Sequence, residues 1–177
     1  MNLWHDISAG KNPPEEINVI IEIPKGSQNK YEIDKETGLI KLDRVLYSAV
    51  HYPGDYGFIP KTLAEDGDPA DAILLTTAPF PPGLLVEARP IGVLLMVDQG
   101  EKDEKLICVP KKDQRFAQMT DLNHVPKATL DEISNFFETY KKLEKKEVRI
   151  DGYRDSKTAK EFIGQCLQRY TKKFNKR

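Results

Sequence analysis

The apolar residues of this 177-residue chain change their spacing between its first two-thirds and its last third. Up to about residue 110, short runs alternate apolar and polar side chains, which is the spacing of β-strands that bury one face. From residue 129 onward, apolar residues recur every three or four positions, which is the spacing of amphipathic helices. A chain with this order builds its core from strands and then packs helices onto it. The sequence therefore predicts an α+β fold.

The predicted strands are short and are separated by turn residues. They lie at 17–23, 30–34, 39–47, 72–76, 84–97 and 105–109. Pro90 and Gly92 interrupt the longest run, so we expect that strand to bend or bulge. The segment 48–71 breaks the alternation and is interpreted as ordered loops, which often carry functional residues.

Two helices are predicted in the C-terminal part of the chain. Thr129 and Glu132 resemble a capping box at the start of the first helix, whose apolar stripe runs from Leu130 to Leu143. The second helix begins near Ser156, and its apolar stripe reaches Tyr170. Both stripes predict helices that pack against the strands.

The composition favours one folded domain spanning 1–177. Hydrophobic residues make up 39% of the chain and charged residues 31%, which is enough apolar material for a core. A net charge of −1 gives no general attraction to nucleic acid or to an anionic membrane, so we expect neither partner. The sequence shows no signal-peptide pattern and no apolar run of membrane-spanning length, and we expect a cytoplasmic protein. Cys108 and Cys166 lie in apolar patterns and are expected to be reduced core thiols.

An acidic loop at 66–71 carries Asp66, Asp68 and Asp71 within six residues. Converging carboxylates repel each other by about 1 kcal/mol per pair at close range in water, and a cation removes this repulsion. Mg²⁺ prefers carboxylate oxygens and waters as ligands, so the loop is a candidate metal site. A solvated acidic turn, with its side chains pointing apart, is the alternative, and it is favoured for such a loop taken alone.

A second acidic cluster at 98–103 includes Asp98 and Asp103 and joins two predicted strands. By itself it is an ordinary charged hairpin loop. Together with the first loop it could complete a site for several metal ions, because two-metal chemistry needs carboxylates from more than one segment.

Arg44 lies on the same face of its predicted strand as apolar residues, so its charge needs a partner. A carboxylate of Glu22 or Glu32 would be a structural partner. A phosphate would be a functional one, because guanidinium binds phosphate through two parallel hydrogen bonds. Lys30 presents the same two alternatives, and each of these residues read singly is more often a surface charge.

Tyrosines and a lysine complete the set of candidate residues. Tyr52 and Tyr56 flank a Pro-Gly turn, where packing within the loop and a functional role are weighed evenly. Tyr140 belongs to the apolar stripe of the first helix, so core packing is its default interpretation. Lys141 is by default a solvated helix charge.

Taken together, these residues resemble the soluble family I inorganic pyrophosphatases of the bacterial type. The resemblance covers roughly residues 7 to 170, and each motif alone is weak. Their occurrence in one order is far more specific than any single motif, and it favours the functional alternative in each case. The motifs lie at 21–24, 30–34, 43–44, 52–57, 66–71, 98–105 and 137–141.

The resemblance implies a fold and a reaction. The fold is an OB-like five-stranded β-barrel with the two helices packed on it. The reaction is the hydrolysis of inorganic pyrophosphate to two phosphates by a water that several bound Mg²⁺ ions activate, and Mn²⁺ could substitute for Mg²⁺. Pyrophosphate is small and offers no apolar handle, so its hydrolysis depends on charge neutralisation and positioning.

The resemblance also assigns a role to each candidate residue. Asp68 is expected to be the general base. The expected metal ligands are Asp66, Asp71, Asp98, Asp103, Glu22 and Glu32. The residues expected to bind the phosphoryl groups are Lys30, Arg44, Tyr56, Lys105, Tyr140 and Lys141.

Two departures and two competing hypotheses accompany this prediction. Gln99 stands where many bacterial members have Glu, and Ala70 replaces a larger aliphatic residue. A nucleic-acid-binding OB module would share the barrel but would need a basic groove with stacking aromatics. A catalytically inactive assembly protein is the other alternative, and the intact set of charged residues argues against it. By resemblance we expect a homohexamer.

Overall fold

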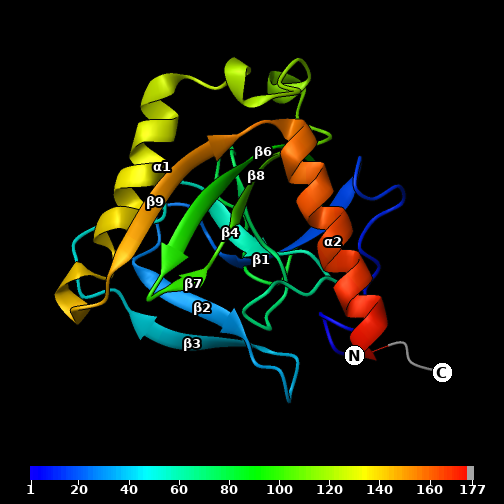
Figure 1. Cartoon of the computed structure of the whole chain (residues 1–177), viewed down its shortest axis with the longest axis horizontal. Helices are drawn as coiled ribbons and strands as arrows, with labels where there is room; N and C mark the ends of the chain where they lie inside the picture. Colours follow the sequence, from blue (N-terminus) through cyan, green and yellow to red (C-terminus); the bar gives the residue numbers. More distant parts are fainter. Residues whose placement is uncertain (175–177) are drawn as a thin grey trace.

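The computed structural model describes residues 1–174 and is built mainly from strands, with two long helices (Figure 1). The strands are β1 (Ile17–Ile23), β2 (Asn29–Ile33), β3 (Ile40–Val45), β4 (Asp55–Phe58), β5 (Asp71–Leu74), β6 (Leu85–Asp98), β7 (Glu101–Lys102), β8 (Lys105–Pro110) and β9 (Val148–Arg154). The long helices are α1 (Lys127–Thr139) and α2 (Ser156–Phe174). Three short 3₁₀ turns are η1 (Gln114–Phe116), η2 (Leu122–His124) and η3 (Lys142–Glu144).

Strand pairing follows a path that returns to its start. β1 pairs with β4, β4 with β5, β5 with β8, β8 with β6, and β6 again with β1. The β5–β8 pairing is parallel, and the other four are antiparallel. β7 and β9 extend this sheet from β6, whereas β2 and β3 form a separate hairpin. The hairpin is joined to the rest of the chain by backbone hydrogen bonds of Tyr52 with Gly26 and Ser27, just before β2, and by side-chain contacts.

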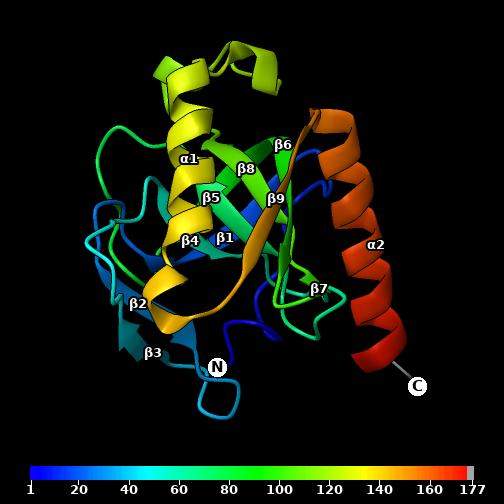
Figure 2. The same cartoon turned by 60° about the vertical axis from the view of Figure 1, so that its left-hand side comes forward.

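The two helices lie on opposite sides of the main sheet in both views (Figure 1 and Figure 2). One apolar cluster includes Phe136 and Phe137 of α1 together with Ile107. A second cluster includes Ile163 and Cys166 of α2. Because both faces of the sheet are covered, every residue of β8 is buried. The sheet-dominated α+β prediction is confirmed, and the buried, unpaired thiols of Cys108 and Cys166 agree with the sequence.

Helix α1 begins two residues before the predicted capping box. Pro126 precedes it in an extended conformation, and Lys127 forms a 2.8 Å ion pair with Asp131 one turn later. Thr129 therefore lies inside the first turn, and its interpretation as the start is wrong. Leu143 lies in η3 and is 65% exposed, so it does not belong to the apolar stripe. Helix α2 begins at Ser156 as predicted.

The strands agree with the sequence except at four places. β4 lies within the segment interpreted as loops, β7 lies within the predicted 98–103 loop, and β9 is not predicted from the sequence. Of the apolar face predicted for 39–47, Leu46 is buried and Ile40 is half-buried, but Leu42 is 52% exposed, so the prediction fails at Leu42. The β2–β3 register shifts between Lys30 and Tyr31, which breaks the simple alternation of faces. The predicted irregularity of the long strand is confirmed, because the β6–β8 register shifts between Pro90 and Gly92.

Over the part of the chain that the structure describes, neither helix has the length and apolar character needed to cross a membrane.

Candidate active site

A polar cavity of about 500 Å³ lies where the β2–β3 hairpin, the 66–71 loop, the 98–103 loop and the end of α1 meet. It is lined by all the predicted catalytic, metal-ligating and phosphate-binding residues except Arg44. Tyr52 also lines it. Segments far apart in the sequence thus bring their acidic, basic and tyrosyl side chains to one place.

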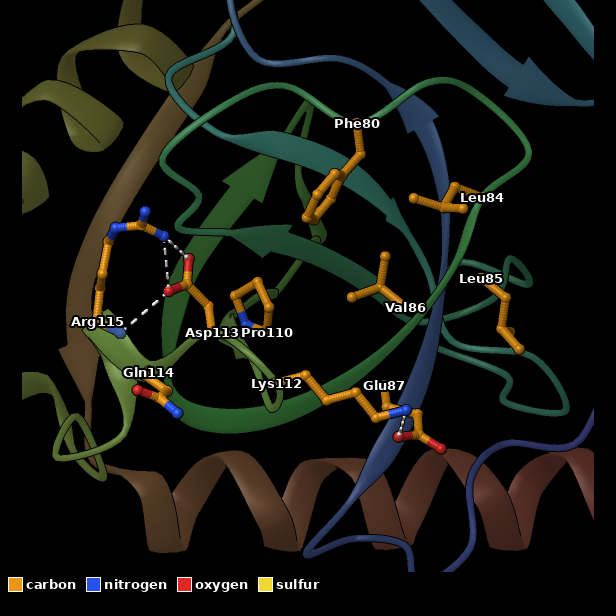
Figure 3. Close-up of a pocket in the computed structure, with 10 residues that line it drawn as sticks. All are labelled: Phe80, Leu84, Leu85, Val86, Glu87, Pro110, Lys112, Asp113, Gln114 and Arg115. Carbon is orange, nitrogen blue, oxygen red and sulfur yellow. Dashed lines mark hydrogen bonds and ion pairs between the residues drawn. The ribbon is translucent and has the colours of Figure 1, made fainter.

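A larger groove of about 820 Å³ lies elsewhere on the molecule and contains none of the predicted residues (Figure 3). Its floor includes Phe80 and Val86. Its charged side chains are paired within the groove, with Lys112 3.3 Å from Glu87 and Arg115 3.1 Å from Asp113. Volume alone would identify this groove as the candidate site, but its charged side chains neutralise each other at the rim. The predicted functional residues line the smaller cavity instead.

Lys105 lies at the centre of the acidic residues. β5 and β8 pair in parallel with Asp71 opposite Lys105, and the 98–103 loop places Asp103 beside them. The Lys105 ammonium donates to Asp71 Oδ2 at 2.6 Å and to Asp103 Oδ1 at 2.5 Å. Burial would lower the pKa of Lys105, but the negative charges of Asp71 and Asp103 contribute to holding it well above its usual value. Two carboxylates from different segments therefore surround one cation.

Other lysines pair with three more carboxylates of the cavity. Lys141 forms an ion pair with Asp98, and Lys35 forms one with Asp68. Lys30 donates to Glu32 at 3.1 Å and to Asp43 at 3.0 Å. With the side chains placed this way, no group of three or more acidic, His or Cys residues within 1–174 is arranged to hold a metal ion.

The donor set of the cavity nonetheless suits a hard divalent cation. It consists of carboxylate oxygens from β1, β2 and two loops, and Asp71 and Asp103 already converge on the positive charge of Lys105. Mg²⁺ takes such oxygens together with waters. The residues present therefore fit this ion, provided that the carboxylates exchange their lysine contacts.

Glu22 is the most deeply buried acidic residue of the cavity, with 5% of its surface exposed. Its Oε1 accepts a 2.6 Å hydrogen bond from the backbone N–H of Ile33, which ties β1 to β2. Burial and the nearby charge of Asp71 raise the pKa of Glu22 to about 8. Burial also raises the pKa of Asp66, although a hydrogen bond from Asp68 N opposes this.

Three tyrosines form an aromatic wall. Tyr52, Tyr56 and Tyr140 pack with Phe136 and Phe137 at ring-centroid distances of 4.6 to 6.4 Å. Burial raises the pKa of each of the three phenols above its usual value. They stay neutral at physiological pH and can donate hydrogen bonds to an anion.

Arg44 lies beside the cavity. It is opposite Lys30 in the β2–β3 hairpin, and it forms ion pairs with Asp43 and Glu144. Glu22 and Glu32, the structural partners that the sequence suggested, are therefore wrong. Sequence reasoning also missed Lys35 and Glu144, because both contacts join segments that are distant in the chain and neither residue has a distinctive local pattern.

The fold and the cavity together are typical of an enzyme that acts on a small, multiply charged substrate. A family model described as inorganic pyrophosphatase matches residues 19–171. The chain belongs to the inorganic pyrophosphatase family, which is a family of hydrolases.

Individual relatives agree with this family. The soluble inorganic pyrophosphatase of Zea mays is 48% identical over 167 residues, which is 94% of this chain and 78% of the relative. The inorganic pyrophosphatase of Halalkalibacterium halodurans is 50% identical over 157 residues, which is 89% of this chain and 96% of the relative. The crystal structure of inorganic pyrophosphatase from Thermus thermophilus matches with a TM-score of 0.93 at 49% identity, covering 97% of this chain and 99% of the other. The predicted family and enzyme class are confirmed.

Proposed function

We propose that this protein hydrolyses inorganic pyrophosphate to two phosphates and that the reaction requires Mg²⁺. The observation that carries the proposal is the cavity in which six acidic residues of the predicted metal site lie among lysine and tyrosine side chains. Such a mixture suits a substrate that is highly charged and must be both neutralised and held. Family membership supports the same reaction.

Six residues would hold the metal ions: Asp66, Asp71, Asp98, Asp103, Glu22 and Glu32. When bound, Mg²⁺ would neutralise the phosphates and make a water more acidic. Several ions per subunit are expected, and Mn²⁺ is a candidate substitute because it takes the same oxygen donors.

Side chains of the protein would accept the proton and bind the substrate. Asp68 is about half exposed in the cavity, where its carboxylate would accept a proton from the attacking water. Lys30, Lys105 and Lys141 would bind phosphate oxygens as cations. Tyr56 and Tyr140 would donate hydrogen bonds from neutral phenols, and Arg44 would bind from the cavity edge.

Further parts of the proposal concern the whole protein. The strand path that returns to β1 supports an OB-like five-stranded barrel. We propose a single domain over 1–177 that forms a homohexamer. A cytoplasmic location is supported by relatives named soluble inorganic pyrophosphatases.

The test is phosphate release from pyrophosphate by the purified protein, with Mg²⁺ and with excess EDTA. We expect release only with Mg²⁺. Asp68→Asn should lower kcat by a factor of about 100 or more, because a positioned general base contributes about 10² to 10⁴. Asp131→Asn, on the exposed face of α1, is the matched control and should keep wild-type activity. Folded protein that releases no phosphate with Mg²⁺ or Mn²⁺ would overturn the proposal.

A further inference from the structure

The β2–β3 hairpin carries Lys30 and Arg44, two of the residues proposed to bind phosphate. It is not hydrogen-bonded as a strand to the main sheet. Backbone hydrogen bonds of Tyr52 with Gly26 and Ser27, just before β2, and side-chain contacts fix its position against the cavity. One such contact is the hydrogen bond from Ile33 N to Glu22. The other side of the hairpin is held by Arg44.

Arg44 forms a largely buried ion pair with Glu144. Arg44 Nε lies 3.0 Å from Glu144 Oε1, and the two side chains are only 21% and 7% exposed. Removing one member of a buried pair leaves an uncompensated charge in a poorly solvated place. The position of the guanidinium therefore depends on Glu144 as well as on Asp43, which contacts Nη1.

Glu144 ends η3, the turn that directly follows Tyr140 and Lys141. The ion pair thus joins the hairpin that carries Lys30 and Arg44 to the segment that carries Tyr140 and Lys141. These two segments supply most of the proposed phosphate-binding groups, and Glu144 itself is not among the residues that line the cavity.

The donors of the Arg44 guanidinium are only partly satisfied. Among the described residues, its buried Nε and Nη2 have no hydrogen-bond partner, and neither does Glu144 Oε2. A buried N–H without a partner is unfavourable, so the nearby negative charges of Glu144 and Asp43 must compensate for it. Charge, rather than a full set of hydrogen bonds, holds the guanidinium in place.

We propose that Glu144 is a positioning residue, which holds the Arg44 guanidinium at the cavity edge for contact with a phosphate oxygen of the substrate. This inference rests on the proposed pyrophosphatase activity. Glu144 also lies 3.6 Å from Lys146, which is not among the residues that line the cavity. Its effect on the substrate should therefore pass through Arg44, so its removal should weaken substrate binding and leave the chemical step nearly intact.

The experiment compares the steady-state kinetics of Glu144→Gln and wild type at saturating Mg²⁺. We expect KM for pyrophosphate to rise about tenfold in the variant while kcat changes less than twofold. Glu144→Asp keeps the charge and should recover most of the loss. Glu147→Gln removes an exposed glutamate just beyond η3 and should match wild type.

A double variant separates positioning from a general effect on folding. In an Arg44→Met background, adding Glu144→Gln should change KM less than twofold, because the residue through which Glu144 acts is already gone. The inference would be overturned if the two substitutions raised KM independently, so that the factors multiply in the double variant. An unchanged KM in Glu144→Gln, or a loss confined to kcat, would overturn it as well. Wild-type protein measured in the same assay tests the proposed function separately, since its failure to release phosphate would overturn that function before any variant is compared.

Discussion

Lysine side chains offset the negative charge of the cavity one residue at a time. Lys30, Lys35, Lys105 and Lys141 each contact an acidic side chain of the cavity. Without these contacts the converging carboxylates would repel each other, and more strongly in this partly buried place than in water. We infer that the lysines reduce this repulsion before metal is bound, and that metal binding frees Lys30, Lys105 and Lys141 to contact phosphate.

Within residues 1–174 no ion pair involves Glu22, and burial is the main cause of its raised pKa of about 8. The folded state therefore keeps a proton on Glu22 between about pH 4.5 and 8, whereas the unfolded state loses it. Its contribution to stability is complete below the unfolded pKa and is lost as pH rises through the folded pKa.

We predict that the free energy of unfolding of wild type in EDTA falls relative to that of Glu22→Gln as pH rises from 5 to 8. One proton corresponds to a slope of up to about 1.4 kcal/mol per pH unit. Urea unfolding at a series of pH values measures the difference, with Glu36→Gln at the exposed hairpin turn as the control. Parallel pH profiles for wild type and Glu22→Gln would contradict the assignment.

At the scale of elements, Asp55 of β4 joins three segments of the chain. Its fully buried carboxylate accepts hydrogen bonds from Lys25 N at 2.8 Å, from Phe80 N at 3.0 Å and from the hydroxyl of Thr76. The turn between Tyr52 and Tyr56 is thereby fixed to the end of β1 and to the β5–β6 connection.

We predict that Asp55→Ala destabilises the protein by about 3 kcal/mol or more, because it leaves two backbone N–H groups and a hydroxyl unpaired in the interior. Asp55→Asn keeps an accepting oxygen and should lose less. Chemical denaturation measures both, with Asp131→Ala on α1 as the exposed control. A loss below about 1 kcal/mol for Asp55→Ala would show that water or a rearranged turn satisfies these donors.

Elements whose apolar residues repeat with one clear period could be predicted from the sequence. Elements whose structure depends on contacts with distant segments could not. α2 shows its apolar face in the order of residues alone, whereas β1 alternates only imperfectly because six of its seven residues are buried. β4 has all four residues buried, so it shows no alternation. Its Gly57 approaches β1 so closely that a Cβ would lie 1.9 Å from Ile20 O, a constraint that only the paired strands reveal. β9 depends on its pairing with β6 at the edge of the sheet, which is also a contact between distant segments.

The residues of the candidate site also divide into those that the sequence could predict and those that it could not. The sequence brings Asp66, Asp68 and Asp71 together through proximity in the chain, and the family motifs supply their roles. The contacts of Lys35 with Asp68 and of Arg44 with Glu144 depend on how the hairpin sits against the loops. No local pattern encodes that placement, so the sequence could not predict these partners.

At the scale of the whole molecule, the cavity is a product of the strand path. The parallel β5–β8 pairing sets Asp71 beside Lys105, and β6, β7 and β8 carry the 98–103 loop to the same end. Carboxylates from separate parts of the chain meet only when the sheet has formed. A cation bound there would therefore stabilise the folded state and not the unfolded chain.

We predict that Mg²⁺ raises the melting temperature of the protein above its value in EDTA and that the increase grows with the logarithm of Mg²⁺ concentration. A ligand at 100 times its Kd adds about 2.7 kcal/mol to the free energy of unfolding. Asp71→Asn removes one proposed metal ligand and leaves Asp103 as a partner for Lys105. The rise in melting temperature that Mg²⁺ causes in this variant should be less than half of that in wild type, whatever the melting temperature of the variant in EDTA. Asp113→Asn, in the groove of paired charges, should keep the full increment. Calorimetric scans measure all three proteins, and equal increments in Asp71→Asn and wild type would place the stabilising cation outside this cavity.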